Sequence, residues 1–138
     1  MSSLATKGLV KRFGRTTVVD NVDVAVSGGE IVGLLGPNGA GKTTCFYMIC
    51  GLIRRDNGHI VLDGNDISDL PMHERARRGI GYLPQEASIF KRLTVKENIL
   101  AVLEALPGLD QNGRQARAME MMETFGIAHK SKDYGYSL

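Results

Sequence analysis

The sequence has little of what marks several classes of protein: it holds two cysteines, no tryptophan and no long apolar run among its 138 residues. Cys45 and Cys50 lie five positions apart, a spacing that points to different faces of a helix and favours neither a disulfide nor a metal pair. No apolar signal-peptide core follows Met1, and no segment is long enough to span a bilayer. We therefore expect a cytoplasmic protein with two reduced, half-buried cysteines.

An excess of charge of one sign is also lacking. Seventeen Lys and Arg residues face fifteen Asp and Glu residues, and the net charge of +2 is too balanced for a nucleic-acid binder. The histidines His59, His73 and His129 are widely spread and suggest no metal site. The length fits one ordinary domain that is large enough to bury a core.

Short strands separated by turns dominate the first part of the sequence. Val22, Val24 and Val26 alternate with polar or small residues, which is typical of an antiparallel strand with one buried face. The expected elements are strands within residues 4–26, at 31–35, 60–62 and 80–83, and helices at about 41–50 and between Pro71 and Gly79.

Helical spacing takes over from residue 90. Thr94 and Glu97 predict a capping box for a helix that runs to about residue 106. A second helix is expected at about 112–125, with Met119, Met122 and Phe125 on one stripe. That stripe fits core packing or a ligand or partner groove. Its solvent side is predicted to hold Arg114, Arg117 and Glu120.

One motif carries specific chemistry, the pattern G-x-x-x-x-G-K-[ST]. It is formed by Gly36, Pro37, Asn38, Gly39, Ala40, Gly41, Lys42 and Thr43. Its glycines let backbone N–H groups approach phosphate oxygens, and the following helix adds its N-terminal dipole. Lys42 supplies a charge at the β and γ phosphates, and the Thr43 hydroxyl is the expected Mg²⁺ ligand. Thr44 points elsewhere but belongs to the expected nucleotide-binding set. The alternative is a plain glycine turn with a solvated Lys42.

The motif has a wider context at residues 34–44 and 81–85, which read Leu-Leu-Gly-Pro-Asn-Gly-Ala-Gly-Lys-Thr-Thr and Gly-Tyr-Leu-Pro-Gln. Together they resemble the nucleotide-binding domain of ABC transporters, and the resemblance covers the whole chain. Residues 79–90 resemble more narrowly the ATPase subunit of bacterial lipopolysaccharide export, with branched-chain amino-acid importer ATPases as near neighbours.

The resemblance implies an α/β fold of the P-loop NTPase class. Residues 1–89 would form an N-terminal antiparallel β subdomain, a partial core sheet and the loop that carries Gln85, and residues 90–138 would begin a helical subdomain. ATP and Mg²⁺ are the implied cofactors. The implied partners are membrane permease subunits and a second ATPase subunit, with the protein peripheral on the inner face of the cytoplasmic membrane.

Two further assignments follow from the resemblance, and one surface feature follows from the residues themselves. Gln85 would contact Mg²⁺ and the attacking water, and Phe13 would stack on adenine. A loop glutamine without a role and a half-buried strand aromatic are the alternatives. Arg75, Arg77 and Arg78 form a predicted basic helix face that is solvated or lies near an anionic membrane.

Several segments of the family are missing from this sequence. No Leu-Ser-Gly-Gly signature, no apolar strand ending in Asp-Glu and no switch histidine follow Gln85, and Leu138 resembles the first signature residue. In the implied fold, strands that follow the signature lie between residues 31–35 and 80–83, and the signature closes over ATP in the dimer. We therefore expect the parent protein to be an ATPase and the 138 residues alone to hydrolyse nothing.

Two other classes remain open at this point. A small-molecule kinase or GTPase shares the phosphate loop, but it needs a base-reading motif or an acceptor site, and neither is found. A nucleotide-binding module without catalysis fits the missing segments.

Overall fold

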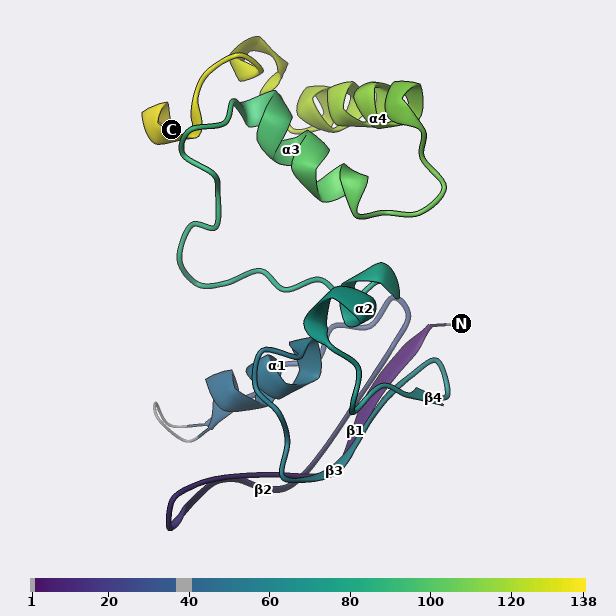
Figure 1. Cartoon of the computed structure of the whole chain (residues 1–138), viewed down its shortest axis with the longest axis vertical. Helices are drawn as coiled ribbons and strands as arrows, with labels where there is room; N and C mark the ends of the chain where they lie inside the picture. The colour runs from purple at the N-terminus through teal and green to yellow at the C-terminus, as the bar shows by residue number, and fades with distance from the viewer. Residues whose placement is uncertain (1, 37–40) are drawn as a thin grey trace. The chain divides into compact units, whose positions relative to one another are not determined.

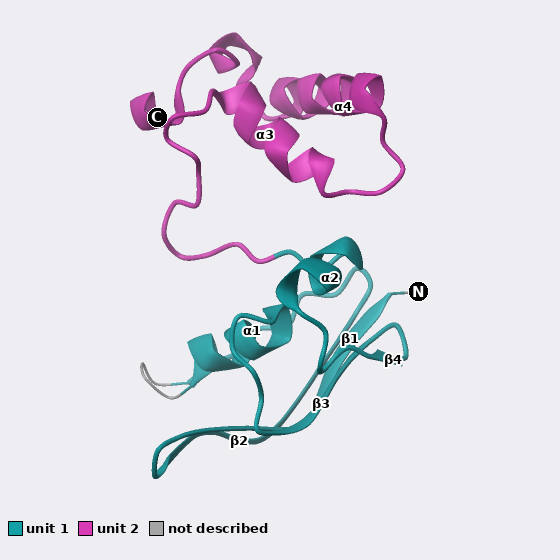
Figure 2. Cartoon of the chain, viewed as in Figure 1, with its two compact units in different colours: residues 1–81 teal, residues 82–138 magenta. Residues whose placement is uncertain are grey.

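The computed structural model describes residues 2–36 and 41–138, which form two compact units, residues 1–81 and 82–138 (Figures 1 and 2). The first unit holds β1 (Ser3–Phe13), β2 (Thr16–Ser27), α1 (Lys42–Cys50), β3 (Asn57–Leu62), β4 (Asn65–Asp66) and α2 (Met72–Arg77). The second unit holds α3 (Val95–Glu104), α4 (Gln111–Thr124) and the short 3₁₀ turns η1 (Ala128–Lys130) and η2 (Gly135–Ser137). Along the described residues, no helix combines the length and the hydropathy of a membrane span.

An antiparallel sheet in the order β2-β1-β3-β4 forms the base of the first unit (Figure 1). β1 and β2 are a hairpin whose register runs from Ser3 opposite Ser27 to Phe13 opposite Thr16. Val22, Val24 and Val26 are partly buried, whereas the residues between them are exposed. The predicted antiparallel, one-faced strand is therefore confirmed, because the alternation places every second side chain against the core.

The core of the first unit lies between this sheet and α1. Leu9 and Ile60 of the sheet pack in one cluster with Cys45 and Met48 of α1, and all four side chains are buried. Cys50 is buried as well, so both cysteines are free and more deeply enclosed than the half-buried state that the sequence predicts. Cys45 is packed in this core, and burial raises the pKa of its thiol.

Two predicted strands are not formed, and those predictions were wrong. Residues 31–35 and 80–83 have no strand conformation, and no described strand pairs with them. Ile31 is 98% exposed, Leu35 94% and Leu83 92%. A continuous apolar run indicates a strand covered on both faces, but the strand exists only when neighbouring strands accept and donate its backbone hydrogen bonds. The described residues supply no such neighbours.

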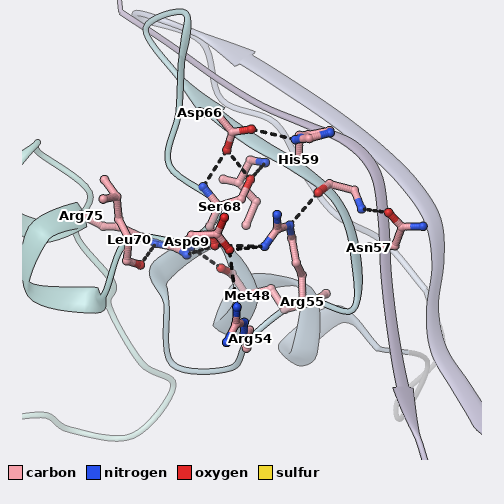
Figure 3. A network of polar contacts seen from close by, with 12 residues as sticks. Met48, Arg54, Arg55, Asn57, His59, Asp66, Ser68, Asp69, Leu70 and Arg75 are labelled. Atoms are coloured by element: carbon pink, nitrogen blue, oxygen red, sulfur yellow. Dashed lines mark hydrogen bonds and ion pairs between the residues drawn. The ribbon is translucent and has the colours of Figure 1, made fainter.

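Arg75 differs most from its prediction, because it belongs to no solvated basic face. Its side chain is 4% exposed, and its guanidinium donates hydrogen bonds to four backbone carbonyls (Figure 3). Nη1 contacts Met48 O at 2.6 Å and Ile49 O at 3.0 Å, Nε contacts Leu70 O at 2.8 Å, and Nη2 contacts Ser68 O at 2.9 Å. The last turn of α1 is thus tied to the loop before α2, while Arg77 pairs with Glu74 at the surface.

A second arginine extends this polar network toward β3 (Figure 3). Arg55 donates to Gly58 O at 2.6 Å and to the Asp69 carboxylate at 2.9 Å. Ser68 accepts the N–H of Ile60 at 2.8 Å and donates to Asp66. The hydroxyl and amide of Ser68, together with His59, lower the pKa of Asp66 to about 2. The loop between β4 and α2 is therefore held by Arg55, which precedes β3, and by Arg75 of α2.

The second unit is built on two capped helices. Thr94 and Glu97 form the predicted capping box of α3, and Asp110 caps α4 by accepting the Gly113 N–H. Leu103 and Met122 are buried, which confirms core packing for part of the methionine stripe.

The rest of the α4 pattern is mixed. Met119 is 40% exposed and Phe125 is 72% exposed, so only the middle of the stripe is covered within the unit. Arg114, predicted to lie in solvent, is partly buried, and its Nε has no hydrogen-bond partner in the described part of the chain. Arg117 pairs with Glu120 at the surface, as its predicted position allows.

The Arg75 contacts predict a large stability effect. In the full-length protein, we expect Arg75→Met to lower the free energy of unfolding by about 3 kcal/mol, because four buried or partly buried carbonyls lose a charged donor. The matched variant Arg77→Met removes an exposed ion pair and is expected to change stability by less than about 0.5 kcal/mol. Urea unfolding followed by circular dichroism measures both values. Equal stability of the two variants would contradict the role given to Arg75.

Candidate functional site

The site begins at the N-terminus of α1, which differs from the other long helices in its cap. Gly41 has φ +88° at the cap position, no side chain within residues 2–36 and 41–138 accepts a hydrogen bond there, and the first turn contains no acidic residue. α3 and α4, in contrast, begin at Thr94 and Asp110, whose side chains occupy the first-turn amides. The N-terminal amides and the positive dipole end of α1 are therefore suited to an external anion.

Gly41 is required by the approach of β2 as well as by its backbone angle. A Cβ at this position would lie 2.2 Å from the carbonyl oxygen of Val18. Any side chain would therefore force β2 away from the start of α1. This contact packs the start of α1 closely against the β1–β2 hairpin. The sequence motif does not indicate the contact, because Val18 is one of several valines in the strand.

Lys42 and the threonines lie on the first turn of α1. The Lys42 ammonium donates to Gly36 O at 2.5 Å, so the lysine reaches across the two ends of the loop. Thr43 is exposed and Thr44 is partly buried. The remaining predicted residues of the motif, Pro37, Asn38, Gly39 and Ala40, lie outside the described residues.

A cavity of about 380 Å³ adjoins the described ends of the loop. Val18, Val22 and Leu34 contribute to its wall, and Gly36 and Lys42 lie at its polar side. Its surface is mostly apolar, so it offers few partners for phosphate oxygens. The groups suited to a triphosphate are those of the helix start, and the cavity wall suits apolar atoms.

Phe13 lies at the end of β1 and is 49% exposed. Its ladder partner Thr16 is two residues from Val18, whose carbonyl lies against Gly41. Phe13 and the start of α1 therefore lie at the same end of β2. The Lys11 ammonium stands 5.3 Å from the centroid of the Phe13 ring. A lysine two residues before the aromatic on one strand shares its face, a signal that motif reading passed over.

Gln85 belongs to the second unit, where it is exposed in a loop after Pro84. The structure thus brings Phe13, Gly36, Gly41, Lys42, Thr43 and Thr44 into one compact unit and describes Gln85 within the other.

The donor set around Thr43 fits Mg²⁺ bound together with a nucleotide. Thr43 offers one exposed hydroxyl oxygen, which is a hard ligand of the kind Mg²⁺ accepts. Within residues 2–36 and 41–138, no three His, Cys, Asp or Glu side chains are grouped to hold a metal. A magnesium ion here would take most of its ligands from phosphate oxygens and water, as it commonly does in nucleotide sites.

Comparison with known proteins places this site in a wider group. The chain is 56% identical to the lipopolysaccharide export system ATP-binding protein LptB of Haemophilus influenzae, and 55% identical to LptB of Escherichia coli K12. Each match covers 100% of this chain and 57% of the relative. The chain therefore spans little more than half the length of these curated relatives.

Solved structures agree with the sequence matches. A nucleotide-free ATP-binding cassette from an ABC transporter superposes with a TM-score of 0.83 at 26% identity, covering 100% of this chain and 59% of that one. An ATP-binding cassette in its ADP conformation superposes with a TM-score of 0.81 at 27% identity and the same coverage. The family model described as ABC transporter matches residues 19–137. With both the fold and the sequence in agreement, this chain belongs to the ABC transporter family.

Proposed function

We propose that the chain binds the triphosphate of ATP, with Mg²⁺, at the start of α1. The observation that carries this proposal is the open helix N-terminus, which has neither a capping side chain nor an acidic residue and has Lys42 beside it. Backbone amides, the helix dipole and the lysine all favour phosphate oxygens. Thr43 gives the metal one oxygen ligand, whereas Thr44, on the same turn, belongs to the nucleotide-binding set and is not a metal ligand.

Phe13 completes the nucleotide site in this proposal by stacking on the adenine ring. Its half-exposed ring and its position at the β2 end that carries Val18 support the assignment. Such a stack contributes on the order of 1 kcal/mol and requires no hydrogen bond.

ATP hydrolysis is proposed for the longer protein that the relatives represent. Gln85 would orient the attacking water there, since an amide donates and accepts without acting as a base. Residues 1–89 would form the nucleotide-binding core and 90–138 part of a helical subdomain. The high identity to LptB proteins favours an energy-coupling role in lipopolysaccharide export over branched-chain amino-acid import. The partners would be permease subunits and a second ATPase subunit, at the cytoplasmic face of the inner membrane.

A second candidate is a nucleotide-binding module without catalysis. ATP turnover by the full-length protein separates the two candidates, because only the first of them predicts hydrolysis.

Lys42 tests the phosphate assignment. We expect Lys42→Ala to weaken ATP binding by at least about tenfold, because the main side-chain charge at the triphosphate is lost. Calorimetry on the full-length protein measures the dissociation constant. Lys7→Ala, an exposed lysine on β1, is the matched control and is expected to leave it unchanged. An unaltered constant in the Lys42 variant would reject the site.

Phe13 tests the base contact separately. Phe13→Tyr is expected to leave ATP affinity nearly unchanged, and Phe13→Ala is expected to weaken ATP binding about fivefold. The reason is that stacking depends on a flat aromatic ring and not on charge. Binding of inorganic triphosphate should be the same in all three proteins. If the unmutated protein binds ATP and inorganic triphosphate equally well, it has no adenine platform.

The 138-residue chain by itself tests the need for further strands. Residues 31–35 and 80–83 expose apolar side chains, and each backbone group that is buried without a partner costs about 1 to 3 kcal/mol. Against a typical net stability of about 5 to 15 kcal/mol, we expect this chain to aggregate or self-associate and to show no ATPase activity. Size-exclusion chromatography and a phosphate-release assay measure both. A folded monomer that turns over Mg²⁺-ATP would refute the expectation.

A further inference from the structure

A fixed cation covers one part of the Phe13 ring. The Lys11 ammonium lies 5.3 Å from the ring centroid and 3.5 Å from Oδ1 of Asp56. The Lys11 side chain is only 15% exposed, so its stem is packed and its head is held between a carboxylate and an aromatic face. Cation and ring attract each other through the ring quadrupole, and the effect grows as the cation loses water.

Asp56 holds the last residues of β1 in place of a strand. The β1–β3 ladder ends with Val10 opposite Asn57. Beyond that pair, Asp56 donates its N–H to Val10 O at 2.9 Å, and its Oδ2 accepts the Arg12 N–H at 2.7 Å. The N–H and the carboxylate of Asp56 therefore bind two backbone groups of β1 that a continued β3 would have paired.

The charge state of Asp56 agrees with this arrangement. The Arg12 amide, followed by the charge of Lys11, lowers the pKa of Asp56 below its ordinary value. The carboxylate is therefore ionised at neutral pH and is able to hold the Lys11 ammonium. Irregular register between β1 and β2 at residues 9–12 makes such an anchor useful, because the ladder there is interrupted.

We propose that Lys11 and Asp56 are positioning residues for the adenine platform: Asp56 pins the end of β1 and holds Lys11, and Lys11 fixes the Phe13 ring from one side. The other side of the half-exposed ring is left for the base. The inference rests on the proposed stacking of adenine on Phe13. It adds that purine affinity depends on two residues outside the phosphate motif, neither of which touches the nucleotide in this arrangement.

The experiment compares ATP with inorganic triphosphate, both in the presence of Mg²⁺, by calorimetry on the full-length protein. We expect Lys11→Met and Asp56→Asn each to weaken ATP about threefold while leaving triphosphate binding unchanged, because the change acts on the ring alone. Lys11→Arg retains a cation and should retain ATP affinity. Lys7→Met removes a charge from an exposed position on the same strand and should alter neither ligand.

A double variant separates positioning from general electrostatics. In a Phe13→Ala background, Lys11→Met should have no further effect on ATP, because the ring through which it acts is gone. An equal loss of ATP and triphosphate in Lys11→Met would show a long-range charge effect and overturn the inference. Thermal unfolding of each variant, followed by circular dichroism, verifies that the sheet is retained.

The failure of this inference is distinguishable from failure of the proposed site. If Phe13→Ala lowers the preference for ATP over triphosphate, whereas Lys11→Met and Asp56→Asn leave it unchanged, the positioning role alone is rejected. If Phe13→Ala leaves that preference unchanged, the platform itself is rejected, and the positioning role with it. If triphosphate binding is lost in Lys42→Ala in either case, the phosphate site stands.

Discussion

The buried guanidinium of Arg75 is the contact on which the first unit depends most. The C-terminal end of a helix carries unpaired carbonyls and a partial negative charge, and an arginine with donors in several directions answers both needs at once. Here the guanidinium donates hydrogen bonds to Met48 O and Ile49 O of α1 and to two further carbonyls in the loop before α2. Burial lowers the pKa of this guanidinium, but an arginine remains charged at neutral pH.

The two ends of α1 consequently differ in how their unpaired backbone groups are satisfied. At its C-terminal end, Gly51 closes the helix in the left-handed conformation while Arg75 binds the carbonyls. At its N-terminal end, Gly41 supplies no capping side chain, and no other described residue caps the first-turn amides with its side chain. A helix that is anchored at one end and open at the other is a rigid mount for phosphate, because the anchor does not compete for the donors that the ligand needs.

β2 connects the two parts of the proposed nucleotide site. Val18 meets Gly41 at a distance that only glycine tolerates, and Thr16 pairs with Phe13. Phe13 and α1 are thus parts of one packed unit whose core includes Leu9 and Met48. Within residues 31–35, Leu34 packs against this core, whereas Ile31 and Leu35 are almost fully exposed, in a chain that spans 57% of the length of its LptB relatives.

The sequence by itself determined the local elements and the phosphate motif, because these depend on neighbours within a few positions. The one-faced strands, the Thr94 capping box and the run from Gly36 to Thr43 were all legible in this way. Only the tertiary structure decided which apolar runs become strands, since residues 31–35 and 80–83 require partners that no local pattern provides. It also decided the role of Arg75. An arginine followed closely by two others, Arg77 and Arg78, reads as solvated, and its burial follows from carbonyls 26 and 27 positions away that only folding brings to it.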